Sequence, residues 1–192
     1  MRSKKKTVIF GGSFDPIHVG HLSLASEVCR RGLANEVWFM VSPQNPHKQG
    51  CVMTDESLRL QMVRLALEGC PGFHASDFEF GLPRPSYTVN TLAALEQAFP
   101  DREFLLLIGA DNWEKFGCWY KGDEILERYG IIVYPRDSED VPELPDGVTW
   151  MSAELHDVSS TMLRGMVAGG KDIAGLVPGA VAEFIEKNEL YK

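Results

Sequence analysis

The stretch that decides the fold is residues 7–22, which read TVIFGGSFDPIHVGHL. Its first four residues form a β-branched and aromatic run closed by the pair Gly11-Gly12, a pattern typical of a buried strand. Apolar residues then recur at helical spacing over 21–31, and Gly32 suits the left-handed end of that helix. The stretch therefore predicts one strand, loop and helix unit, the building block of α/β proteins.

The same alternation continues along the rest of the chain. The next strand, 37–41, has no polar alternation, which indicates a parallel sheet covered on both faces. Further strands are predicted at 73–80, 103–108, 131–134 and 148–151. Helices are predicted from a Thr54 cap to before Cys70, from a Ser86 or Thr88 cap to Phe99, and at 125–129, 159–168 and 178–190.

These elements predict a doubly wound α/β fold with a mostly parallel sheet. The whole chain, 1–192, is expected to form a single domain, with the helical portion at about 159–192 packed on the sheet. Gly11-Gly12 and Gly109-Ala110-Asp111 each follow a strand, so both loops are expected at carboxyl ends of parallel strands. In such sheets these ends line the ligand crevice, where crossovers leave neighbouring strands in opposite directions.

Composition excludes several classes of protein. Of the 192 residues, 44% are hydrophobic and 24% charged, which is ordinary for a globular protein and unlike collagen, coiled coils or disordered chains. Lys and Arg number 19 against 27 Asp and Glu, so the net charge is −8. That acidity argues against a surface for nucleic acid or anionic membrane, so small-molecule partners are expected.

Cysteine usage and apolar runs predict a cytoplasmic protein. The four cysteines lie far apart without a C-x-x-C pair, which indicates reduced thiols rather than a disulfide framework or a zinc site. The apolar run that follows the basic N-terminus is too short for a signal peptide. The longest apolar run, 104–110, is far below the ~18 residues of a membrane helix.

The strongest chemical signal is the pair His18 and His21 at the predicted strand-to-helix junction. Glycines let the backbone approach a phosphate, and a helix N-terminus offers N–H groups with a partial positive charge. Histidines three residues apart in a first turn project to one side, toward the same anion. A lone histidine is more often a cap or core residue, but two of them behind Gly11-Gly12 favour anion binding.

A second signal is Ser159-Ser160-Thr161 followed by Arg164, at the start of a predicted helix. The hydroxyls and free amides suit a helix start, and Arg164 lies one turn along on the side of Thr161. A guanidinium there offers two N–H donors to one phosphate. Alone, this pattern is an ordinary N-cap with a solvated arginine. Together with the two histidines it indicates a binding site for a polyphosphate.

The segment GGSFDPIHVGHL resembles the HxGH signature of the nucleotidyltransferase superfamily, which implies a Rossmann-like nucleotidyltransferase fold. Residues 158–164, VSSTMLR, resemble its second signature, with valine where isoleucine is usual. A dinucleotide oxidoreductase would show G-x-G-x-x-G with an acidic residue ~20 positions later, and that pattern is missing here. The resemblance implies transfer of a nucleotidyl group to a phosphate acceptor.

Further segments resemble the nicotinate-nucleotide adenylyltransferase branch of that superfamily. They are Ser42 to Lys48, Arg84 to Leu92, Gly109-Ala110-Asp111, Trp119 and the tail from Leu176 to Tyr191. Two positions depart from the branch: Asn45 stands where proline is common, and Arg136 follows Tyr134-Pro135 where an R-P-G order is usual. Arg136 therefore receives no assigned role.

The resemblance implies adenylyl transfer from ATP to nicotinate mononucleotide, giving deamido-NAD and pyrophosphate in NAD biosynthesis. His18, His21 and Arg164 would be catalytic. ATP would bind Gly11, Gly12, Ser13, Phe14, His18, His21, Gly109, Asp111, Ser159, Ser160, Thr161 and Arg164. The acceptor would bind Lys48, Thr88, Trp119 and Tyr120, and Lys48 would also join the ATP phosphates. Mg²⁺ would arrive on ATP, with no dedicated protein site.

Three residues, two of them from these sets, have competing interpretations. Asp111 suits a ribose hydroxyl better than a metal ion. Trp119 offers a face for a pyridine ring, and core packing beside Trp113 and Phe116 is the alternative. Asp15 is expected to hold its own turn by an Asx-type hydrogen bond rather than to bind ligand.

Two other functions stay open at this point. The chain could be another HxGH adenylyl- or cytidylyltransferase, such as the pantetheine-phosphate enzyme, or a regulator that binds nucleotide without turnover. Its length and the segments 86–92, 109–111 and Trp119 favour the nicotinate branch. Intact His18, His21 and Arg164 argue against the regulator. Nucleic acid and membrane are not expected as partners, and a homo-oligomer is left open.

Overall fold

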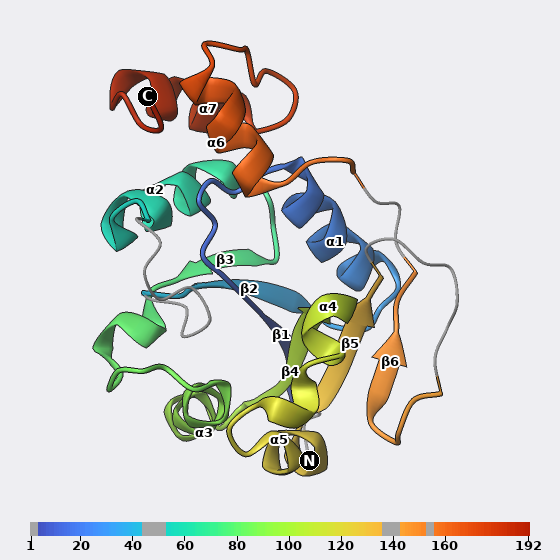
Figure 1. Ribbon diagram of the computed structural model, residues 1–192. Helices are drawn as coiled ribbons and strands as arrows, with labels where there is room; N and C mark the ends of the chain where they lie inside the picture. Colours follow the sequence, from blue (N-terminus) through green and yellow to red (C-terminus); the bar gives the residue numbers. More distant parts are fainter. Residues whose placement is uncertain (1–3, 44–52, 136–142, 153–155) are drawn as a thin grey trace.

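The computed structural model describes residues 4–43, 53–135, 143–152 and 156–192. Its centre is a six-stranded parallel sheet in the order β3-β2-β1-β4-β5-β6 (Figure 1). The strands are β1 (Lys5–Gly12), β2 (Glu36–Val41), β3 (Phe73–Ser76), β4 (Arg102–Gly109), β5 (Gly130–Tyr134) and β6 (Val148–Trp150). The predicted parallel α/β architecture is confirmed.

Helices follow each of the first four strands, and two more follow the last strand. They are α1 (Val19–Arg30), α2 (Glu56–Ala66), α3 (Thr88–Ala98), α4 (Ala110–Trp113), α5 (Gly122–Arg128), α6 (Ser160–Ala168) and α7 (Gly179–Lys187). Two 3₁₀ turns, η2 (Phe78–Gly81) and η3 (Phe116–Cys118), join them. As predicted, α1 ends in a left-handed Gly32, whose φ is +68°. Among the described residues no helix has the length and apolar character needed to cross a membrane.

Side chains of each central strand alternate between two cores, one on each face of the sheet. Val8 and Phe10 point into the core that α1, α2, α6 and α7 cover. Ile9, between them, points into the core that α3 and α5 cover. Figure 1 shows these two helix groups on opposite sides of the sheet. Both strand faces are therefore apolar, which explains the unbroken hydrophobic runs.

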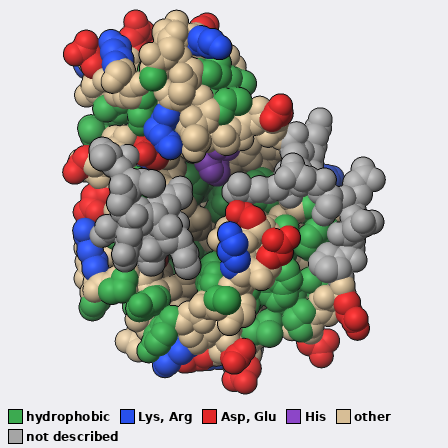
Figure 2. Space-filling model, viewed as in Figure 1, with side chains coloured by type: hydrophobic (Ala, Val, Ile, Leu, Met, Phe, Trp, Pro, Cys, Tyr) green, Lys and Arg blue, Asp and Glu red, His purple; other side chains and the backbone are tan. Residues whose placement is uncertain are grey.

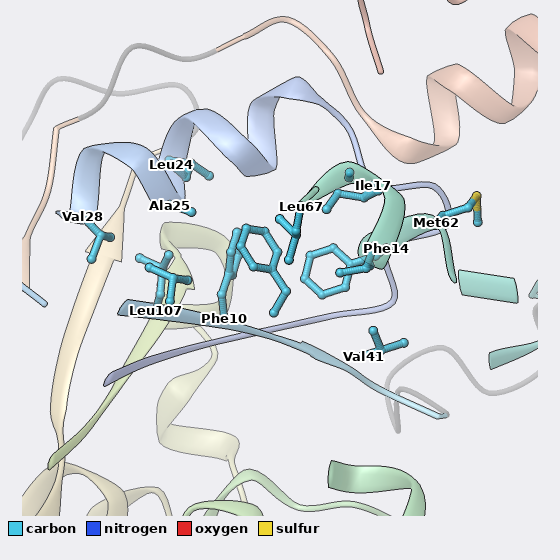
Figure 3. Close-up of a cluster of buried hydrophobic side chains, with 14 of the residues drawn as sticks. Phe10, Phe14, Ile17, Leu24, Ala25, Val28, Val41, Met62, Leu67 and Leu107 are labelled. Carbon is cyan, nitrogen blue, oxygen red and sulfur yellow. The ribbon is translucent and has the colours of Figure 1, made fainter. Parts of the chain in front are cut away.

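The first core also anchors the loop that follows β1. Figure 3 shows Phe10 of β1, Phe14 of that loop and Ala25 of α1 in one cluster. Phe14 is only 2% exposed, and its φ of +46° lies in the left-handed region that favours glycine. Gly12 makes room for its ring, since a Cβ on Gly12 would lie 3.0 Å from Phe14 Cζ. The loop is thus held by a buried aromatic side chain.

The strand order places a switch point between β1 and β4. From β1 the chain crosses to β2 on one side, and from β4 it crosses to β5 on the other. The two strands are direct neighbours, with Phe10 paired to Leu107. The loops after Gly12 and Gly109 therefore leave the same edge of the sheet, as the sequence predicts, and they flank the crevice typical of such folds.

Several predicted boundaries were wrong. The third strand stops at Ser76 instead of 80, because its last pair is Met40 with Ser76 and residues Phe78–Gly81 form η2 instead. The first strand continues through Gly11 and Gly12, which pair with Met40 and Val41.

The predicted N-caps of two helices were also wrong. Asp55, rather than Thr54, caps α2, because its Oδ1 accepts from Ser57 N at 2.8 Å. Tyr87 occupies the N-cap position of α3, where no side chain caps the helix. Neither Ser86 nor Thr88 therefore serves as the cap of α3.

Candidate active site

The candidate site lies where β1 and β4 end and α1 and α6 begin. In Figure 2 a hollow opens in this face of the molecule, and histidine side chains lie at its floor. Residues that the sequence assigned to ATP reach this edge from segments far apart in the chain, because the parallel sheet collects the carboxyl ends of its strands there.

The two histidines form the N-terminal cap of α1. His18 is the extended N-cap residue, and His21 occupies the third helical position. The backbone N–H of His18 donates to Nδ1 of His21 at 3.2 Å, so His21 takes the accepting role that a glutamate has in a capping box. Their ring centroids lie 3.7 Å apart. The structure therefore brings both imidazoles to one place at the positive end of a helix.

The cap also determines which nitrogen of neutral His21 carries the proton. Because Nδ1 accepts the hydrogen bond from His18, the proton resides on Nε2. The ring itself is held by Phe10 and Phe14, whose centroids lie 5.8 and 5.1 Å away. In that tautomer His21 carries an Nε2–H donor, a group that can bind a phosphate oxygen.

Gly20 is required by the packing of His18. A Cβ at Gly20 would lie 3.1 Å from Nδ1 of His18 and 3.3 Å from Cγ1 of Val158. His18 is buried, with 7% exposure, so its ring has little room to move away. The glycine between the histidines thus allows the N-cap ring to lie against the first turn of α1 and the segment before α6.

The start of α6 docks on the loop that precedes the histidines. Ser159 caps the helix, its Oγ accepting from Met162 N at 3.2 Å. Ser160 Oγ donates to the carbonyl of Pro16 at 2.9 Å. Arg164 donates to the carbonyl of Asp15 at 2.8 Å and to Thr161 Oγ1 at 3.3 Å. The second motif and the histidine motif therefore form one site, and the phosphate roles of these residues stay predictions.

Asp15 connects this loop to distant parts of the chain. Its carboxylate accepts from the backbone N–H of Thr54 at 3.3 Å and from the hydroxyl of Tyr191 at 2.7 Å. The side chain is buried, with 4% exposure. The expected Asx-type bond within the turn was wrong, because these partners lie 39 and 176 positions away.

Arg59 is a residue of this region that the sequence interpretation missed. It is 1% exposed, and its guanidinium donates to the carbonyls of Ser13, Ser42, Pro43 and Thr54 at 2.7, 2.9, 3.1 and 2.9 Å. It thereby ties the ends of β1 and β2 to the start of α2. Burial lowers the pKa of Arg59 from its usual value. A signal exists in the sequence, since Arg59 occurs at helical spacing with Met62, Val63 and Ala66.

At the end of β4, Gly109 and Asp111 begin the short helix α4. A Cβ on Gly109 would lie 2.5 Å from Oδ1 of Asp111, so only glycine leaves the carboxylate where it is. Asp111 is half-buried at the edge of the sheet that carries the histidines. Its proposed bond to a ribose hydroxyl stays a prediction.

The residues predicted for the acceptor form a second group. Thr88 is the first residue of α3, and the ring of its neighbour Tyr87 lies 4.6 Å from that of Tyr120. Both tyrosines are exposed, at 38% and 51%. Tyr87 belongs to the segment 84–92, but its sequence context predicts no role for it. The structure thus brings the start of α3 and the segment after η3 together.

The surroundings of Trp119 agree in part with core packing and in part with a face left for a pyridine ring. It packs on Phe116 at 5.3 Å between ring centroids, and Trp113 stacks on Phe116 at 5.1 Å. The indole is only partly buried, so it is not a core residue alone. Lys48 and Arg136 lie outside the described residues.

No group of three or more His, Cys, Asp or Glu side chains that could hold a metal ion is found in the described part of the chain. Asp111 is therefore not part of such a group, and no set of protein ligands for a resident metal is found among these residues.

Comparison with known proteins identifies the class of this site. The family model described as cytidylyltransferase-like matches residues 9–166, a span that holds both histidines and Arg164. The chain therefore belongs to the cytidylyltransferase-like family. The resemblance seen in the two signature motifs is confirmed at this level.

Similar proteins define the branch. A Bacteroides fragilis protein named as a probable nicotinate-nucleotide adenylyltransferase is 49% identical over 185 residues, 95% of this chain and 92% of its own. The Bacillus subtilis nicotinate-nucleotide adenylyltransferase is 38% identical over 188 residues, 98% and 99% of the two chains. Within the family, the chain is thus a member of the nicotinate-nucleotide adenylyltransferases.

A solved structure shows the same fold at low sequence identity. The Plasmodium falciparum nicotinic acid mononucleotide adenylyltransferase, complexed with NaAD, has a TM-score of 0.81 to this chain. Its sequence is 18% identical, and the match covers 97% of both chains. The two chains therefore share one fold.

Proposed function

We propose that the protein transfers the adenylyl group of ATP to nicotinate mononucleotide, giving deamido-NAD and pyrophosphate in NAD biosynthesis. The observation that carries this proposal is the joined pair of motifs: two histidine rings 3.7 Å apart at the start of α1, bonded through the 15–16 loop to Arg164 of α6. Similarity to the nicotinate-nucleotide adenylyltransferases supplies the substrates.

The reaction needs orientation and charge neutralisation more than acid or base chemistry. A phosphate oxygen of the acceptor attacks the α-phosphorus of ATP, and the bond from that phosphorus to the bridging oxygen breaks as pyrophosphate leaves. The second pKa of a phosphate monoester is ~6, so the attacking oxygen is already mostly ionised at neutral pH. Catalysis then consists of holding two polyanions in line and stabilising the charge that develops.

Each catalytic residue has a proposed role in that scheme. His21 donates from Nε2 to the phosphate that carries the developing charge, while its Nδ1 holds the cap. His18 supports the same anion from the neighbouring position. Arg164 neutralises the triphosphate while it fixes the loop through the carbonyl of Asp15.

The remaining proposed ATP contacts lie at the ends of β1 and β4 and at the start of α6. A Cβ on Gly11 would meet nothing within 4 Å, so this strand end is open to a phosphate. Mg²⁺ is proposed to arrive bound to the ATP phosphates, where it would neutralise their charge. The proposed compartment is the cytoplasm, where ATP is available.

The acceptor is proposed to bind between the start of α3 and the segment after η3. Trp119 would stack on the pyridine ring, and backbone N–H groups near Thr88 and Tyr120 would donate to the carboxylate. The contact between the Tyr87 and Tyr120 rings supports this arrangement, because it brings the two backbone segments together. Lys48 keeps its proposed role toward the phosphates, although it lies outside the described residues.

The test is a pyrophosphate-release assay with ATP and a panel of acceptors: nicotinate mononucleotide, nicotinamide mononucleotide and pantetheine phosphate. The nicotinate form should be preferred over the amide, because the amide sets its NH₂ group against a backbone donor, at a cost of ~1–3 kcal/mol. That mismatch corresponds to a kcat/KM ratio of roughly 5 to 150.

Other outcomes of this assay would indicate a different function. Turnover of pantetheine phosphate alone would indicate another branch of the family, and ATP binding without turnover of any acceptor would indicate a regulator. Equal kcat/KM for both mononucleotides would remove the carboxylate-reading pocket. Trp119→Ala should weaken both mononucleotides together, because stacking recognises the ring and not its substituent.

A further inference from the structure

The C-terminal segment returns to the loop that carries the histidines. Figure 1 shows α7 and the chain end beside α6, above the sheet. The carbonyl of Leu176 accepts from the backbone N–H of Val19, the first residue of α1, at 3.0 Å. Leu190 and Tyr191, beyond α7, pack against the core that α1 and α2 cover. The end of the chain is therefore part of the structure around the candidate site.

Tyr191 contacts the loop that precedes the histidines. Its hydroxyl donates to Oδ1 of Asp15 at 2.7 Å and lies 3.9 Å from Sδ of Met62. Asp15 is 4% exposed, so its carboxylate depends on protein donors instead of water. Burial raises the pKa of Tyr191. The hydroxyl therefore remains a donor at every pH at which the enzyme would act.

Asp15 transmits this contact to the proposed catalytic groups. Its carbonyl accepts from Arg164 at 2.8 Å, while Oδ2 of its carboxylate accepts from the N–H of Thr54 at 3.3 Å. The next residue, Pro16, accepts from Ser160 at 2.9 Å, and His18 follows two positions later as the cap of α1. A shift of Asp15 would therefore move the histidine pair and Arg164 relative to each other.

The backbone conformation of Tyr191 indicates that surrounding contacts hold this residue in place. Its φ of +64° lies in the left-handed region, which residues with a Cβ avoid. The ring packs against the core, and the hydroxyl is held at Asp15. Such conformations persist where the surrounding structure determines them.

We propose that Tyr191 is a positioning residue: its hydroxyl fixes Asp15, and through the Asp15 backbone it sets the placement of His18 and Arg164 for adenylyl transfer. This inference rests on the proposed function. Tyr191 is proposed to act through Asp15 and not on either substrate. Without its hydroxyl, Asp15 Oδ1 loses this donor and the carboxylate reorients toward the buried guanidinium of Arg59, whose charge interacts with it.

The test compares Tyr191→Phe with Tyr129→Phe. Both variants remove one hydroxyl that donates to a carboxylate, and Tyr129 donates to Glu96 at 3.0 Å on the other face of the sheet. Phenylalanine keeps the ring packing in each case. We expect Tyr191→Phe to lower kcat by at least about tenfold with the KM of the acceptor unchanged, because small displacements of catalytic groups are costly. Tyr129→Phe should keep the kcat of the wild type.

A second measurement does not depend on turnover. The chain has five histidines, so the ring signals of His18 and His21 are resolvable by NMR. These two should shift in Tyr191→Phe and stay in place in Tyr129→Phe. An unchanged kcat, an equal loss of kcat in both variants, or unmoved histidine signals would each overturn the proposal.

The wild-type protein is assayed first with ATP and nicotinate mononucleotide. If it shows no turnover, the proposed function fails, and the NMR comparison alone decides whether Tyr191 positions the histidines.

Discussion

The two ring nitrogens of His21 serve different purposes. Nδ1 accepts from the His18 backbone and thereby belongs to the cap of α1, while Nε2 carries the proton for the ligand. An alanine substitution removes both functions and also the ring contacts with Phe10 and Phe14. A variant that keeps only the cap separates stability from catalysis.

His21→Asn is that variant. The amide oxygen stands close to the position of Nδ1 and accepts from the His18 N–H, but no donor reaches the position of Nε2. We expect kcat to fall ~10²- to 10³-fold, the usual loss for one donor to developing charge. The thermal unfolding temperature should fall less than in His21→Ala, because the cap remains although the ring contacts with Phe10 and Phe14 are lost. A kcat near that of the wild type would rule out the donor role.

Gly20→Ala tests the space beside His18. The new Cβ would lie 3.1 Å from Nδ1 of His18, closer than ordinary van der Waals contact, so the ring must shift. We expect kcat to fall about tenfold or more while the helix propensity of α1 improves. Gly179→Ala is the control, since a Cβ at the start of α7 meets nothing within 4 Å. Equal kcat values for the two variants would contradict the role of Gly20.

Helix α6 is attached to the histidine loop because side chains of the helix donate hydrogen bonds to backbone carbonyls of the loop. Ser160 and Arg164 both donate to carbonyls of residues 15–16. The guanidinium fork lets Arg164 bind a carbonyl and still present N–H groups to a ligand. A helix that is docked in this way carries a charged side chain at a defined distance from α1.

Arg164→Lys keeps the charge but loses the fork. One ammonium cannot hold the Asp15 carbonyl and the triphosphate with the same geometry, so ATP should bind more weakly. We expect kcat/KM for ATP to fall roughly 10- to 150-fold, the equivalent of a charged hydrogen bond of ~1.5–3 kcal/mol. Initial rates at varied ATP provide the measurement. Unchanged ATP use in Arg164→Lys and Arg164→Ala would show that Arg164 does not bind ATP.

The sequence predicts those features of the whole fold that depend on local patterns. The strand at β4 and the helix ending at Gly32 follow from runs of apolar residues and from one left-handed glycine. The joining of the two motifs at one edge follows from parallel topology. The partners of Asp15 cannot be predicted from the sequence, because Thr54 and Tyr191 are 39 and 176 positions away and have no periodic relation to it.

The other end of the sheet holds a buried carboxylate that the sequence does not single out. Glu36 begins β2 and has 1% side-chain exposure. It accepts from Thr7 at 2.7 Å and from Arg102 at 3.0 Å, and it pairs with Lys5. Burial alone would raise the pKa of Glu36, but the hydrogen bonds from Lys5, Thr7 and Arg102 outweigh it and lower the pKa to about 2.

This pKa predicts how stability depends on pH. A carboxyl whose folded pKa lies below its unfolded value of ~4.3 stabilises the fold above that value and loses the contribution as pH falls toward about 2. Lys5 is half-exposed, so solvent screens its contribution. We expect the free energy of unfolding to fall by about 2 kcal/mol between pH 5 and pH 2.

Urea unfolding of the wild type and of Glu36→Gln at several pH values provides the measurement. The difference between their unfolding free energies should shrink as pH falls, because protonated Glu36 and glutamine are equally uncharged. A difference that stays constant from pH 5 to pH 2 would mean that the Glu36 carboxylate contributes nothing through its charge.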